Sequence, residues 1–84
     1  MCTYVTEKVA VSGSAKGPGG WFRVTDGSVY FDHPVHAPVD HSLNIDFRNP
    51  AGAPSARVAV ELSEESARAL VAAIQATLDA GNGH

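Results

Sequence analysis

The stretch from Ala56 to Asp79, ARVAVELSEESARALVAAIQATLD, decides the fold class because the spacing of its apolar residues changes once. Up to Leu62 the apolar side chains alternate with other residues, which is typical of a half-buried β-strand. From Ser63 they recur at helical spacing and form one stripe, made of Ala67, Leu70, Val71, Ile74 and Leu78. We therefore predict a strand from Ala56 to Leu62, followed directly by a helix.

Both ends of this helix carry capping signals. Ser63 is a favourable N-cap, and Glu64 and Glu65 place negative charge in the first turn, where the helix dipole stabilises it. Gly81 follows the last apolar turn, so we expect the helix to stop near Asp79.

Four further strands are predicted before this stretch, at Thr3–Ala15, Trp21–Thr25, Ser28–Asp32 and Leu43–Arg48. Asp26-Gly27 separates the second from the third, and this dipeptide is typical of a tight hairpin turn, which needs positive φ angles. Short connections favour neighbouring strands. The expected structure is a single domain of residues 1–84 in the α+β class, an antiparallel five-stranded meander sheet followed by one C-terminal helix packed on one face.

The helix is too short to cover such a sheet. Sixteen residues of helix span about 24 Å, which leaves part of a five-stranded apolar face bare. Either the sheet curls strongly or a second subunit covers the remainder. We favour the second possibility and expect a homodimer or a higher homo-oligomer.

Composition excludes several classes of function. The chain has 84 residues, with nine acidic against six basic side chains, and its net charge of −3 argues against binding to nucleic acid or to an anionic membrane. No apolar run approaches the roughly 20 residues that a transmembrane helix needs. A single cysteine and a start without the regions of a secretory signal predict a cytoplasmic protein.

Three of the four histidines fall within the segment DHPVHAPVDH, residues 32–41. Neutral imidazole is the commonest protein ligand for metals, and zinc held by three protein ligands keeps a fourth position open for catalysis. We therefore predict a site for zinc, or another divalent transition metal, formed by His33, His36 and His41. The plainer alternative is that these are ordinary polar residues of a proline-containing loop.

Three other residues are candidates for the same site. Cys2 is a possible fourth metal ligand because a thiolate binds zinc strongly, although a small buried side chain at the start of a strand explains it equally. Asp32 and Asp40 adjoin the histidines, where a carboxylate orients an imidazole ring or acts as a general base.

Trp21, Asp46 and Arg48 are the candidate substrate-binding residues. Asp46 and Arg48 alternate with the apolar positions of their strand, so they face away from the helix and offer an acid and an anion clamp. The alternative is that this pair belongs to a solvated face and that Trp21 belongs to the core or an interface.

The opening Met1-Cys2-Thr3-Tyr4, the pairs Asp32-His33 and Asp40-His41 and the closing helix resemble a family of short bacterial proteins with a domain of unknown function. The resemblance covers nearly the whole chain. It implies a compact stand-alone domain, and it implies no activity.

The residues themselves favour a metal-dependent hydrolase that acts on a small ester, lactone or amide. Metal lowers the pKa of a bound water to about 7 and polarises a carbonyl. Two alternatives remain open. One is a structural metal site that holds the histidine-rich segment together, and the other is a metal-free dimeric module that binds a small ligand or a protein.

Overall fold

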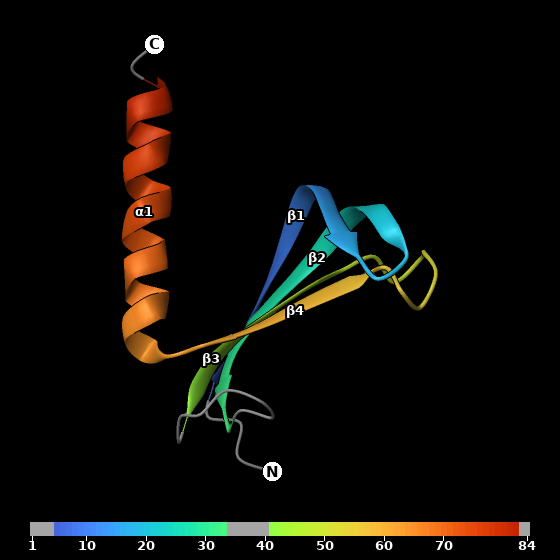
Figure 1. The fold of residues 1–84 in the computed structure, drawn as a ribbon, viewed down its shortest axis with the longest axis horizontal. Helices are drawn as coiled ribbons and strands as arrows, with labels where there is room; N and C mark the ends of the chain where they lie inside the picture. The colour runs from blue at the N-terminus through green and yellow to red at the C-terminus, as the bar shows by residue number, and fades with distance from the viewer. Residues whose placement is uncertain (1–4, 34–40, 83–84) are drawn as a thin grey trace.

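The computed structural model describes residues 5–33 and 41–82. It places four strands before one helix: β1 (Val5–Gly17), β2 (Gly20–Asp32), β3 (Ser42–Arg48), β4 (Arg57–Leu62) and α1 (Glu64–Asn82) (Figure 1). The strands form one antiparallel sheet in the order β1-β2-β3-β4. The predicted antiparallel sheet with one C-terminal helix is confirmed, but it has four strands rather than five.

The fifth strand was predicted wrongly because Asp26-Gly27 is not a turn. β2 runs through both residues, with Asp26 paired to Ala10 and Gly27 paired to Val9 of β1. Gly27 is buried, and a Cβ there would lie 3.1 Å from Cγ1 of Val9. The glycine therefore gives room for the side chain of Val9 on the neighbouring strand.

The tight connection lies instead at Pro18 and Gly19, between the paired residues Gly17 and Gly20. Proline fixes its own φ near −65°, which suits the first turn position. Gly20 has φ +106°, the only positive φ among the described residues, and glycine adopts that conformation without steric cost.

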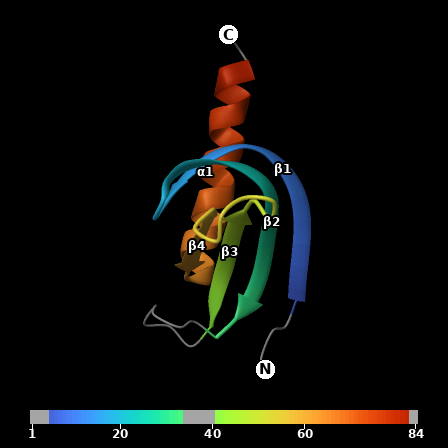
Figure 2. The ribbon, with the colours of Figure 1, turned by 90° about the vertical axis from the view of Figure 1, so that its right-hand side faces the viewer.

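The sheet curls strongly, as one of the two sequence-based alternatives anticipated. The pairing of β1 with β2 shifts between Ala10 and Gly13, and such a bulge bends and twists a strand. Beyond it the β1–β2 hairpin arches over the end of the sheet (Figure 2). Its tip meets the start of β4, because a Cβ on Gly17 would lie 3.0 Å from the carbonyl oxygens of Ser55 and Arg57.

The helix begins as predicted but ends later. Ser63 Oγ accepts a hydrogen bond from the backbone N–H of Ser66 at 3.1 Å, so Ser63 is the N-cap. α1 continues through Gly81 to Asn82 instead of stopping near Asp79. Gly81 does not adopt the positive φ that a glycine helix stop requires, so the backbone stays helical for three more residues.

α1 lies against the sheet less closely than expected. It contacts β3 and β4, yet none of its residues 64–82 is buried, and Figure 1 shows it diverging from the strands toward its C-terminal end. In the described part of the chain the buried apolar residues are Val24 and Ala56. No helix among the described residues is long and apolar enough to cross a membrane.

Candidate functional site

The sheet brings His33 and His41 together. Asp32 of β2 pairs with Ser42 of β3. His33, which follows Asp32, and His41, which precedes Ser42, therefore lie opposite each other at the same end of the sheet. The two imidazole rings stack with centroids 4.9 Å apart and planes 26° apart. The predicted convergence of these two histidines is therefore present, and strand pairing causes it.

Two imidazoles at this separation are compatible with one metal ion. Zinc lies about 2.0–2.1 Å from each histidine nitrogen, so two such nitrogens lie within about 4 Å of each other. The ring centroids, 4.9 Å apart, are close to that separation. Among residues 5–33 and 41–82, however, no three ligating side chains are close enough to hold an ion. Cys2, His36 and Asp40 lie outside the described residues.

The histidine pair also adjoins the apolar face of the sheet. His33 lies two residues after Phe31 on β2, and His41 lies two residues before Leu43 on β3, so all four face the helix side. The ring of His41 stacks on Phe31, with centroids 5.8 Å apart and planes 14° apart. The histidines thus continue the apolar face at its open end.

An apolar cavity of about 520 Å³ separates α1 from the sheet beside this pair. Its walls come from β1, β2, β3 and the first half of α1, and they include Val5, Val29, Phe31, Leu43, Ile45, Leu70, Val71 and Ile74. Phe31 belongs both to the cavity wall and to the ring stack with His41. His41 is therefore separated from the cavity by the ring of Phe31, and the cavity volume suits a small organic molecule.

Asp32 holds the backbone at the entrance to this site. Its carboxylate accepts a hydrogen bond from the backbone N–H of His33 at 2.7 Å. The Ser42 hydroxyl donates its hydrogen to Asn44 Oδ1 at 2.6 Å, and its oxygen lies 3.5 Å from the carbonyl oxygen of Asp32. Ser42 is fully buried, so this arrangement fixes where the two strands end and the histidines begin.

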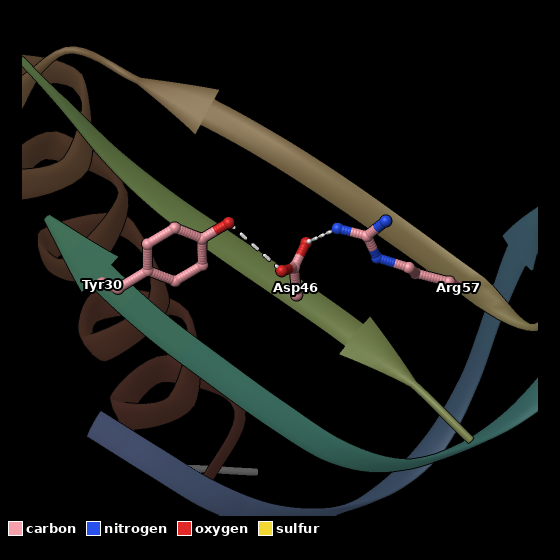
Figure 3. A network of polar contacts seen from close by, with 3 residues as sticks. All are labelled: Tyr30, Asp46 and Arg57. Atoms are coloured by element: carbon pink, nitrogen blue, oxygen red, sulfur yellow. Dashed lines mark hydrogen bonds and ion pairs between the residues drawn. The ribbon is translucent and has the colours of Figure 1, made fainter. Parts of the chain in front are cut away.

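Asp46, a predicted substrate-binding residue, lies on the opposite face in a polar cluster with Tyr30 and Arg57 (Figure 3). It accepts a hydrogen bond from the Tyr30 hydroxyl at 3.3 Å and one from the Arg57 guanidinium at 3.1 Å. Burial, and then the negative charge of Asp46, raises the pKa of Tyr30 above its ordinary value near 10. Arg48, which we predicted to act with Asp46, is exposed two residues farther along β3, where it pairs with Arg57 of β4.

Tyr30 and Arg57 are the residues that the sequence reasoning missed. The alternation of polar residues placed them on the face of Asp46 but did not show the pairing. Asp46 pairs with Ser28 and Ala59, so both partners reach it diagonally from two residues along their strands. Only the strand register reveals such contacts.

Trp21 is not brought near the histidines. It pairs with Lys16 beside the β1–β2 turn, at the end of β2 farthest from Asp32, and it is 71% exposed. Asp32 lies eleven positions farther along β2, about 35 Å away if the strand were straight. Its predicted role in substrate binding therefore has no support from proximity to the histidine pair.

Comparison with protein families gives a match over residues 1–84 to the family of unknown function DUF6295. The chain belongs to the DUF6295 family. No curated protein and no solved structure matches it significantly.

The membership is consistent with the resemblance seen in the sequence, and it brings no activity to this DUF6295 chain. What its geometry offers is a pair of adjacent imidazoles beside an apolar cavity, with a separate Tyr30–Asp46–Arg57 cluster on the opposite face of the sheet. The cluster satisfies its own charges internally. The imidazole pair is therefore the better candidate for chemistry.

Proposed function

We propose that the protein binds zinc, or another divalent transition metal, through His33 and His41, and that it is a metal-dependent hydrolase of a small ester, lactone or amide. The observation that carries the proposal is the ring pair at 4.9 Å, held by the ends of two paired strands. His36 is the third ligand in this proposal, with Cys2 or Asp40 as candidates for the remaining positions.

The apolar cavity supports a small-molecule substrate. Phe31 lines the cavity and stacks on His41, so an apolar acyl or alcohol group in the cavity would lie beside the metal ligands. A zinc ion held there supplies a water with a pKa near 7 and polarises the carbonyl. Asp32 holds the backbone of His33 in place, and Asp40 remains the candidate general base.

Metal binding is tested on untagged protein purified without added metal. We expect one zinc per site by elemental analysis, and we expect His33→Ala and His41→Ala each to weaken zinc binding at least tenfold in a chelator competition. Loss of a residue that only hydrogen-bonds to a metal ligand lowers metal affinity about 10–100-fold, so loss of the ligand itself should lower it at least as much. His84→Ala, outside the cluster in sequence, is the control. Wild-type affinity in His41→Ala would contradict the site.

Hydrolysis is tested with a chromogenic short-chain ester. Removal of metal by a chelator should abolish turnover, and zinc should restore it. Turnover that survives metal removal would exclude this mechanism. If the chelator instead lowers the thermal midpoint sharply and no substrate is turned over, the metal site is structural.

A second candidate, binding of an apolar small molecule without metal, is favoured by the cavity alone. It predicts no zinc by elemental analysis and a rise in thermal midpoint with an apolar ligand, because a ligand that binds only the native state stabilises it.

A further inference from the structure

The apolar side of α1 is uncovered along most of its length. Val71 is 66% exposed, and Leu70, Ile74 and Leu78 on the same stripe are exposed as well. On the sheet, Val5 and Val9 of β1 are also exposed. An apolar surface that continues from helix to sheet in this way marks an interaction site in a soluble protein.

Sheet width explains why one helix leaves this surface open. Four strands spaced about 4.8 Å apart are nearly twice as wide as one helix of about 10 Å. α1 contacts β3 and β4 and faces β1 and β2 only across the cavity, so the half of the apolar face formed by β1 and β2 has no helix packed directly on it. A second helix is needed to cover the face. The described residues, 5–33 and 41–82, contain only α1.

The solvent-accessible surface area of the chain is larger than expected for a compact monomer, which is consistent with a missing partner. Its accessible surface is 6119 Å², whereas a folded monomer of 8.7 kDa exposes about 4,700 Å². Its radius of gyration is 14.1 Å, against about 12 Å for a compact domain of this length. The surplus, about 1,400 Å², is summed over the whole chain, and a standard interface buries roughly 800 Å² of each subunit, so a surplus of this size leaves room for one.

We propose that a second copy of this chain covers the surface, each α1 lying over the β1–β2 half of its partner's apolar face. This interface goes beyond the proposed metal site and does not depend on it. A small molecule in the cavity would cover Val71 and Ile74 but would leave Leu78, which is not part of the cavity lining, in water. A partner helix covers all three.

Charge also favours a second copy over a lipid surface. Within residues 64–82 the helix carries Glu64, Glu65 and Asp79 against the single basic residue Arg68, which an anionic membrane repels. Glu64 and Arg68 form an ion pair at 2.8 Å beside the cavity. This ion pair neutralises the charge of Glu64 where α1 borders the cavity.

Sedimentation equilibrium and light scattering on the full chain, from 1 to 100 µM, test the proposal. We expect twice the 8.7 kDa mass of the chain. The double variant Val71→Lys/Leu78→Lys should weaken the dimer at least a hundredfold. Ala69→Lys/Ala76→Lys adds the same charge at the same seven-residue spacing on the opposite side of α1, and it should stay dimeric.

Val9→Lys tests the sheet half of the interface and should also weaken the dimer. A wild-type monomer at 100 µM would overturn the proposal, as would a mass of one chain plus a small molecule in native mass spectrometry. Equal effects of the two lysine pairs would overturn it as well. A dimer that survives Val9→Lys would refute the placement of the partner helix over β1 and β2. Far-UV circular dichroism at 1 µM checks that each variant keeps its helix.

Discussion

The polar cluster on the outer face of the sheet predicts a non-additive loss of stability. Asp46 is only 15% exposed at its side chain, and its carboxylate is held by the Tyr30 hydroxyl and by Arg57, which is 56% exposed. Substituting both partners, as Tyr30→Phe with Arg57→Met, leaves a mostly buried carboxylate without these two donors. The cost of that state is the desolvation of a charge rather than the loss of two contacts.

The magnitudes follow from the geometry. The Tyr30–Asp46 hydrogen bond is long at 3.3 Å, and long hydrogen bonds are weak. Tyr30→Phe should therefore lower the free energy of unfolding by about 1 kcal/mol. Arg57 is largely solvated, so Arg57→Met should cost about 0.5 kcal/mol. The double variant should cost about 3 kcal/mol, because an unpaired buried charge adds roughly 1–3 kcal/mol to the two single losses.

Urea unfolding at pH 7 and one fixed protein concentration measures all four members of the cycle. Arg48→Met is the matched control, since Arg48 is an exposed arginine of the neighbouring strand and its loss should change stability by less than about 0.5 kcal/mol. Adding Asp46→Asn to the double variant should recover most of the extra loss. If the double variant equals the sum of the single ones, Asp46 is already well solvated and the reasoning fails.

Two further predictions concern the backbone and the pH dependence. Gly20→Ala forces a side chain into φ +106° and should cost about 1–2 kcal/mol in urea unfolding, whereas Gly13→Ala, which meets nothing within 4 Å, should cost no more than about 0.5 kcal/mol. The pKa of Tyr30 is raised in the folded state, first by burial and then by Asp46. Its contribution to stability is therefore full below the unfolded pKa near 10 and falls as the pH rises through the folded pKa. The loss of stability between pH 9 and pH 11 should be smaller in Tyr30→Phe, and an unchanged loss would contradict this.

The strands and the helix were predictable because each follows from local chemistry. Alternation in Leu43–Arg48 and Ala56–Leu62 located β3 and β4 within a residue, and the Ser63 cap located the start of α1. Asp26-Gly27 misled because the same dipeptide serves a turn or a crowded strand. Only the neighbouring Val9, eighteen positions before Gly27 in the sequence, decides between them.

The candidate site was predictable in part for a related reason. Sequence proximity alone suggested that His33 and His41 converge, and strand register explains why they do. The same register places Asp32 on the other face from the imidazoles, with its carboxylate on the backbone of His33. The roles of Tyr30 and Arg57 depend on diagonal contacts between strands, which no pattern along one strand contains.

The apolar cavity connects the two proposals without making one depend on the other. Its wall at Phe31 touches His41, and its wall at Val71 belongs to the surface that a second copy would cover. A partner helix over β1 and β2 would exclude water from the cavity, and lower polarity strengthens the interaction of a metal with a carbonyl oxygen. The dimer would then affect turnover while metal affinity, which depends on the imidazoles, stays the same. Leu78→Lys separates these effects, since Leu78 is not part of the cavity lining and its substitution leaves His33, His41 and the cavity wall in place.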